Sequence, residues 1–394
     1  MRRMIGTQAR AIRAPLISQG DDLEAIVVEC VLEAARAEGF AIRDRDIVAV
    51  TESLLARSQG NYVDVTEIAD AARQLFPGSF VVLFPILSRN RFSLVLRGLA
   101  QSGRKVVVML SYPCDEVGNR LMDVDAMEAA GIDPATDVLS EREYRRHFGD
   151  GYRHPFTGLD YVALYAGLGV GGNLDIVLAN DPLRALEYSK DVVVANIHDR
   201  HRIKARLSAA GGRKVVSLDD LMNEPRNGGW NPEYGLLGSN QAGATRLKLF
   251  PRDAQPFCEG ISRRLFEETG KCVEVLVYGD GAFKDPIGKI WELADPVVAP
   301  GFTPGLNGTP NEIKIKYIAD NELAGMPAGE ADEKLRAMIA KKDSDLRSKE
   351  ASLGTTPRRL TDLIGTLCDL MSGSGDKGTP IVHIQGYFDN FSSE

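Results

Sequence analysis

The middle of the chain alternates short apolar segments with helical ones, and this alternation constrains the fold more than any other feature. Helical patterns at 183–188 and 202–210 separate segments that have the apolar character of buried strands. Strands and helices that follow one another in turn predict an α/β fold, or an α+β one, with a partly parallel sheet. The expected strands lie at 80–84, 105–110, 175–178, 191–197 and 214–218.

The two ends of the chain carry further elements. Asp21 and Asp22 precede an apolar pattern with helical spacing, and acids suit the start of a helix. Residues 223–235 are rich in Asn, Pro and Gly, which predicts a linker. We expect strands at 46–51, 273–278 and 381–384, and helices at 254–270, 330–350 and 360–371.

Length and charge limit the class of protein. A chain of 394 residues exceeds one ordinary hydrophobic core, so two or three domains are expected. The net charge of -8 disfavours binding to nucleic acid. No segment reaches the roughly 18 apolar residues of a membrane span, and residues 1–17 lack the apolar centre of a signal peptide. Five scattered cysteines without a CxxC pair predict no disulfide framework. These features predict a cytoplasmic protein.

A glycine-rich turn near the C-terminus is the best candidate for a phosphate site. It reads MSGSGDKGTP and spans residues 371–380. Gly373, Gly375 and Gly378 allow backbone N–H groups to converge, and Lys377 adds a cation. The segment lacks the GxxxxGK[ST] pattern, which excludes a standard P-loop. A plain flexible turn is the alternative interpretation.

Asp280 is the first candidate for a metal ligand. It follows the apolar segment 273–278 and lies between two glycines, a position where a carboxylate often holds Mg²⁺ or Mn²⁺ against phosphates. Asp285, Glu292 and Asp295 follow closely and are further candidates. The alternative is that these residues are ordinary acids of a loop.

Other patterns carry weaker hypotheses. Residues 169–172 match the dinucleotide motif GxGxxG incompletely, and a plain loop is the preferred interpretation. His198 and His201 have no marked third metal ligand, so a surface turn or helix start is expected there. His383 alternates with apolar residues, which predicts a packed, hydrogen-bonded histidine.

Three collinear segments resemble the coenzyme F420-0:L-glutamate ligase family. The first, IRAPLISQGDDLEAIV, is similar to that family's opening, where a P-L-I stretch contacts a guanine nucleotide. VAVTESLLARSQGN resembles its V-T-x-x-x-x-S-K-A-E-G-R segment, with Arg57 at the lysine and Gly60 at the glycine. Ala56, Gln59 and Asn61 stand where Ser, Glu and Arg are usual. The resemblance assigns nucleotide contacts to Pro15, Leu16, Ile17 and Ser18.

The second and third segments lie near the C-terminus. GLLGSNQAG resembles the family's G-I-D-x-S-N, with Asn240 expected near the nucleotide and Leu237 in place of a metal-binding Asp. Asp280 lies one position beyond the family's second metal Asp. Residues 358–387 resemble the family's closing helix, loop and strand. Within them Gly373 stands in place of an acidic ligand, and Asp376 and Gly378 match the family.

The resemblance implies an acid–amino-acid ligase. In the implied reaction a carboxylate acceptor, coenzyme F420-0 or a relative, is phosphorylated by GTP (or ATP), and the amine of L-glutamate then attacks the acyl phosphate. Mg²⁺ or Mn²⁺ is implied, with K⁺ as a further ion, and the family predicts a homodimer. Two alternatives are the same chemistry on a folate-like pterin, and a nucleotide-binding protein without ligase activity.

These inferences predict a ligase-like core, residues 1–61 and 235–394, into which an expanded α/β subdomain, residues 62–234, is inserted. The expected catalytic residues are Asp280, Arg57 and Lys377, and the expected metal ligands are Asp280, Asp285 and Glu292. The nucleotide is expected to contact Pro15, Leu16, Ile17, Ser18, Arg57, Asn240, Gly373, Ser374, Gly375, Asp376 and Gly378.

Overall fold

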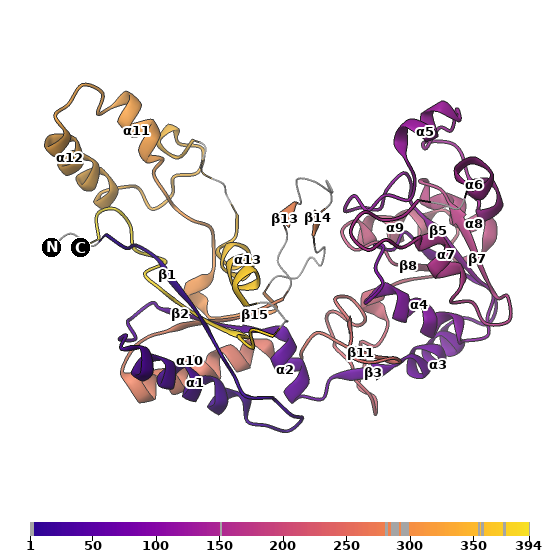
Figure 1. Ribbon diagram of the computed structural model, residues 1–394, viewed down its shortest axis with the longest axis horizontal. Helices are drawn as coiled ribbons and strands as arrows, with labels where there is room; N and C mark the ends of the chain where they lie inside the picture. The colour runs from indigo at the N-terminus through magenta and orange to yellow at the C-terminus, as the bar shows by residue number, and fades with distance from the viewer. Residues whose placement is uncertain are drawn as a thin grey trace.

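The protein is built around two large sheets, which lie in separate lobes (Figure 1). The computed structural model describes residues 4–149, 152–279, 283–284, 291–292, 299–353, 355, 358–372 and 376–393. Within these ranges the chain forms a five-stranded, a six-stranded, a three-stranded and a two-stranded sheet. This mixed architecture confirms the predicted α/β class.

The five-stranded sheet joins the two ends of the chain. Its order is β1-β16-β2-β12-β15, so the last strand of the sequence lies between the first two. Strand β2 runs parallel to β12 and antiparallel to β16, which also pairs antiparallel with β1. The strands are β1 (Gln8–Ile12), β2 (Ile47–Thr51), β12 (Glu274–Tyr278), β15 (Gly301–Phe302) and β16 (Ile381–Gln385).

Alternate residues of this sheet face different helices. Val48 and Val50 pack with α1 (Leu23–Glu38) and α10 (Ala254–Thr269), whereas Ile47 and Ala49 lie in the cluster that contains buried residues of α13 (Leu360–Ser372). The period-2 pattern of a strand buried on both faces explains this division. Asp22 caps α1 by accepting a hydrogen bond from the Ala25 N–H at 3.0 Å, as the acids before this helix predicted.

The six-stranded sheet occupies the second lobe. Its order is β6-β7-β5-β4-β8-β9, and all neighbours are parallel except β6 with β7. Helices cover both faces, as a parallel sheet requires. The strands are β4 (Phe80–Leu83), β5 (Val106–Leu110), β6 (Leu139–Ser140), β7 (Leu174–Leu178), β8 (Asp191–Val194) and β9 (Lys214–Ser217). The predicted strands of this region are confirmed, with ends shifted by up to three residues.

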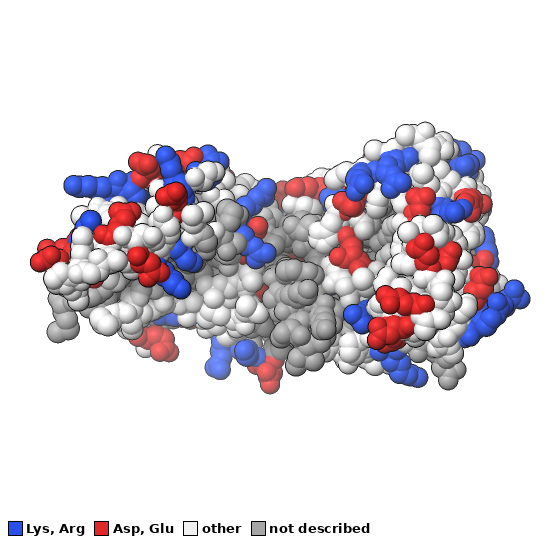
Figure 2. Space-filling view, turned by 90° about the horizontal axis from the view of Figure 1, so that it is seen from above, with Lys and Arg blue, Asp and Glu red and all other residues white. Residues whose placement is uncertain are grey.

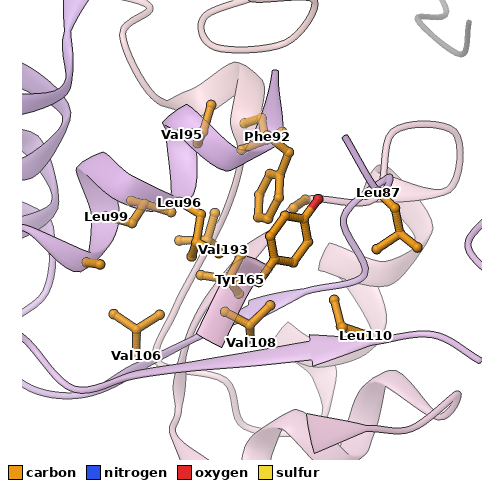
Figure 3. Packing of buried hydrophobic residues seen from close by; sticks show 14 of the residues in the cluster. Leu87, Phe92, Val95, Leu96, Leu99, Val106, Val108, Leu110, Tyr165 and Val193 are labelled. Carbon is orange, nitrogen blue, oxygen red and sulfur yellow. The ribbon is translucent and has the colours of Figure 1, made fainter. Parts of the chain in front are cut away.

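Figure 3 shows how one face of this sheet is packed. Phe92 and Leu96 of α4 project toward Val108 of β5 and Val193 of β8, and Tyr165 of α7 lies beside them. These side chains are almost completely buried. The helices of the lobe are α3 (Val65–Leu75), α4 (Phe92–Ala100), α5 (Val124–Ala129), α6 (Glu141–Phe148), α7 (Tyr161–Ala166), α8 (Ala185–Tyr188) and α9 (Arg200–Ala209), with 3-10 turns at Pro182–Arg184 and Leu218–Asp220.

A small sheet connects the lobes. It has the order β10-β11-β3, with strands β3 (Tyr62–Asp64), β10 (Asn240–Gln241) and β11 (Arg246–Lys248). Leu237 and Leu247 belong to the apolar cluster of the second lobe, although both follow the predicted boundary at residue 234. The division into a core and an inserted subdomain stays a prediction, and the small sheet spans its boundary.

A helical pair lies near the termini, above the five-stranded sheet in Figure 1. It contains α11 (Ile315–Asn321) and α12 (Ala328–Ala340). The predicted helix at 330–350 was wrong in its second half, because α12 ends at Ala340. Beyond the helix, Asn311 holds the chain in place: its side chain donates to the Asp343 carbonyl at 2.8 Å and accepts from the Leu346 N–H at 2.9 Å. The remaining elements are β13 (Phe283–Lys284), β14 (Trp291–Glu292) and 3-10 turns at Pro304–Leu306 and Glu350–Ser352.

A buried polar network lies at the edge of the six-stranded sheet where its parallel strands have their carboxyl ends. Asp115 accepts hydrogen bonds from the N–H groups of Leu87, Val117 and Asn119 and from the Asn119 side chain, which lies 2.9 Å from His154. Burial raises the pKa of the Asp115 carboxyl to about 6 and lowers the pKa of His154. This network ties the loops that follow β4 and β5 to each other.

We expect Asp115→Asn to lower the free energy of unfolding by about 1–3 kcal/mol, because the new amide group would face N–H donors. Since the folded pKa of Asp115 is raised, its contribution to stability is complete below pH 3.8 and is lost as pH rises through about 6. The stability difference between wild type and variant should therefore widen from pH 7.5 to pH 5 in urea unfolding. A difference that narrows over this range would contradict the assignment.

Candidate functional site

Four segments converge at one edge of the five-stranded sheet. In the register of the strands, Ile12 pairs with Ile381, Ile381 with Val50, and Tyr278 with Thr51. The carboxyl ends of β1, β2 and β12 therefore meet the amino end of β16. Residues 13–18, helix α2 (Glu52–Ser58), the chain after Tyr278 and residues 376–380 all emerge there. All the segments that carry the family resemblance reach this edge, except the one with Asn240.

The N-terminal segment and the end of the C-terminal turn are directly connected. The Ala14 N–H donates to the Gly378 carbonyl at 3.3 Å, and the Thr51 N–H donates to the Pro380 carbonyl at 3.0 Å. Gly378 has a φ of 63°, a left-handed conformation that favours glycine. The structure thus brings together the two ends of the predicted nucleotide site, which are more than 350 residues apart in sequence.

Helix α2 and the loop after it support the N-terminal segment. The Arg57 guanidinium donates to the Ile17 carbonyl, and the Gly20 N–H donates to the Ser58 carbonyl at 2.8 Å. Gly60 allows close approach, because a Cβ at this position would lie 2.3 Å from the side chain of Gln19. Within the segment, Ile17 is buried and Leu16 is 91% exposed, so Leu16 presents an apolar side chain to solvent.

Two residues that depart from the family pattern have a structural role. Gln59 exchanges hydrogen bonds with the backbone of Arg252, at 2.6 Å and 2.9 Å. Asn61 is completely buried, donates to the Phe250 carbonyl at 2.7 Å and accepts from the Trp230 N–H at 3.0 Å. Both amides therefore hold the segment after β11 against the end of α2.

A buried ion pair that the sequence did not reveal lies at the same edge. The Lys248 ammonium is 3.1 Å from the Glu52 carboxylate and donates to the Ser53 hydroxyl at 2.5 Å. Glu52 is the first residue of α2, immediately after β2. No local pattern could have predicted this contact, because the partners are 196 residues apart.

Asn240 joins the site through this lysine. It pairs with Lys248 across β10 and β11, so the two side chains share a face of the small sheet. Leu237, for which the sequence resemblance implied a metal-binding Asp, is 1% exposed and packs in the apolar cluster of the second lobe. This position does not fit a divalent ion, because a buried leucine offers no ligand.

The other predicted site residues divide into two groups. Asp376 and Lys377 are exposed in the turn that leads to β16. The second group lies outside the described residues: Asp280, Asp285, the side chain of Glu292, Gly373, Ser374 and Gly375. Over the ranges that the structure covers, no three His, Cys, Asp or Glu side chains lie close enough to hold a metal ion.

The structure also places the three histidines for which the sequence carried a prediction. His383 is buried and lies 3.0 Å from Asp46 at the opposite edge of the sheet, which confirms a packed, hydrogen-bonded residue. His198 contacts Glu116 at 2.7 Å. Helix α9 begins two residues later and contains the exposed His201.

Acidic and basic side chains are intermixed over the face of the molecule that Figure 2 shows.

A comparison with models of known protein families identifies the family of the chain. A model described as F420-0:Gamma-glutamyl ligase matches residues 11–386. The chain belongs to this family. The matched range extends over residues of both lobes. No curated protein matched the sequence, and none of the helices that the structure describes is long and apolar enough to cross a membrane.

We predict that Gly60→Ala loosens the N-terminal segment of this ligase-family protein. The substitution combines an unfavourable φ of 61° with a clash against Gln19, and should cost more than about 1 kcal/mol. Gly39→Ala is the matched control, since its φ is 68° and nothing lies within 4 Å of an added Cβ. Thermal unfolding and trypsin cleavage after Arg13 measure the effect. Equal behaviour of both variants would show that the close approach is unimportant.

Proposed function

We propose that the chain joins L-glutamate to a carboxylate acceptor, coenzyme F420-0 or a related molecule, through an acyl phosphate formed with GTP. The observation that carries this proposal is the convergence, at one sheet edge, of residues 13–18, α2 and residues 376–380. The family match over residues 11–386 supports the ligase chemistry. A cytoplasmic homodimer completes the proposal.

The reaction has two balanced steps. An oxygen of the acceptor carboxylate attacks the γ-phosphorus, the bond to the oxygen bridging the β- and γ-phosphates breaks, and GDP leaves. The glutamate nitrogen then attacks the acyl carbon, loses a proton and expels phosphate as the amide forms. Both steps depend on positioning and on neutralising phosphate charge more than on a protein nucleophile.

The chain's own groups have distinct tasks in this proposal. Leu16 contacts the nucleotide base, and the backbone near Gly378 contacts phosphate oxygens. Lys377 and Arg57 contribute positive charge, while the bond from Arg57 to the Ile17 carbonyl also fixes the base-binding segment. Mg²⁺ or Mn²⁺, with K⁺ as a further ion, stays part of the proposal through Asp280, Asp285 and Glu292. When bound, such a divalent ion would neutralise phosphate charge.

Two alternatives remain for comparison. A pterin acceptor related to folate would use the same chemistry. A nucleotide-binding protein without ligase activity is favoured by one observation, the buried Leu237 where the family has a metal carboxylate. Turnover of nucleotide separates this last candidate from both ligases.

The decisive experiment uses isotopically labelled L-glutamate. The protein is incubated with Mg²⁺ or Mn²⁺, GTP or ATP, and a panel of deazaflavin and pterin carboxylates, and products are read by mass spectrometry. We expect an acceptor carrying labelled glutamate, formed together with GDP and phosphate. Nucleotide binding without any glutamylated product across the panel would favour the non-ligase alternative.

Asp280 provides a second test of the proposed site. Asp280→Asn removes a negative charge but keeps the size of the side chain, so it should preserve most of the nucleotide affinity and abolish metal-dependent turnover. Calorimetry measures the affinity, and GDP release measures turnover. Wild-type turnover by the variant would remove Asp280 from the mechanism.

A further inference from the structure

Lys248 is an unusual lysine because it is only 9% exposed at the edge of the candidate site. It is the last residue of β11 and lies opposite Asn240 on one side and Tyr62 on the other. Its ammonium group is 3.2 Å and 3.1 Å from the two oxygens of Glu52 and 2.5 Å from the Ser53 hydroxyl. The head group is therefore fixed where β2 passes into α2.

Stability alone explains this arrangement poorly. Removing both charges from water costs several kcal/mol per ion, and apolar residues of similar volume often stabilise a fold as well as a buried pair does. Lysine is also rarely buried unless it has a partner. At the edge of the candidate site such a pair can also hold an ammonium group in a fixed position of low dielectric constant, where its contact with an anion is strong.

The neighbouring segment lacks the negative charge that the family uses to hold a cation. Leu237 replaces the metal-binding Asp, and it is buried among apolar side chains. Asn240, three residues later, is directly opposite Lys248. This part of the site therefore carries an ammonium group on β11 that the Glu52 carboxylate holds in place, and no carboxylate at position 237.

We propose that Lys248 is a phosphate-binding residue whose ammonium, oriented by Glu52 and Ser53, neutralises the polyphosphate of the bound nucleotide. It contributes positive charge beside the position where the sequence resemblance implies a carboxylate that holds an ion. This inference rests on the proposed function only in assuming that the site binds a nucleoside triphosphate. The ligand class is a polyphosphate anion, and the charge acts without a metal ion.

The test compares binding of GTP, ATP, inorganic tripolyphosphate and guanosine by calorimetry, without acceptor or glutamate. The main variant is Lys248→Met with Glu52→Gln, which removes both charges and leaves no unpaired buried ion. Lys248→Arg keeps the charge. The control is Lys105→Met with Asp175→Asn, which removes a lysine–carboxylate pair of 2.7 Å in the second lobe.

We expect the Lys248→Met and Glu52→Gln variant to bind GTP or ATP and tripolyphosphate about tenfold more weakly or worse, which is the loss of one charge-assisted contact. Guanosine affinity should not change, and the loss should persist in EDTA. Lys248→Arg and the control should bind within about threefold of wild type. A purely structural role would instead weaken guanosine and the phosphates together.

The possible failures are distinguishable. If the wild type binds nucleotide and the double variant binds it equally well, the role of Lys248 is overturned and the proposed function stands. If the wild type binds neither nucleotide nor tripolyphosphate, both are overturned. Thermal unfolding of each variant accompanies the calorimetry, so that a folding defect is recognised. If the double variant does not fold, Lys248→Gln, which removes the charge and keeps a polar head group, replaces it, and unchanged tripolyphosphate affinity then overturns the role of Lys248.

Discussion

Strand β2 is hydrogen-bonded to β12 on one side and to β16 on the other, and the arrangement of the site depends on these two pairings. They bring segments from the beginning, the second half and the end of the chain into one sheet. Because β2 and β12 are parallel and β16 runs against them, the loops that carry the family resemblance leave from a single edge, except the one with Asn240. Hydrophobic burial by α1 and α10 on one face and α13 on the other stabilises the pairing.

The sequence predicted the long, well-patterned elements of the fold and missed the short ones. Strands such as Val106–Leu110 are buried on both faces and therefore read as continuous apolar runs. Strand β10 has two residues and β3 has three, which is too short for any periodicity, although they form the sheet that connects the lobes. The end of α12 was missed for a different reason, because the chain beyond it is bound by the distant Asn311, which no local pattern reveals.

The candidate site shows the same division between local and long-range information. Family motifs identified Ile17 and Arg57, and their backbone and side-chain contact is present. Motifs could not identify Lys248, since its meaning depends on Glu52, which lies in another part of the chain. The substitutions Gln59 and Asn61 also became interpretable only in space, where both amides hold the segment after β11.

The central position of β16 has a consequence for folding during translation. Residues 381–385 are synthesised after the other four strands of this sheet, yet they fill the gap between β1 and β2. During translation the second lobe, whose strands are contiguous in sequence, can complete its sheet first. The five-stranded sheet is complete only after β16 is made, and until then the backbone N–H and C=O groups of β2 are unpaired on one side. A chain that is truncated before residue 381 would therefore have one complete lobe and, in the other, a sheet edge with unpaired backbone groups that can pair with another chain.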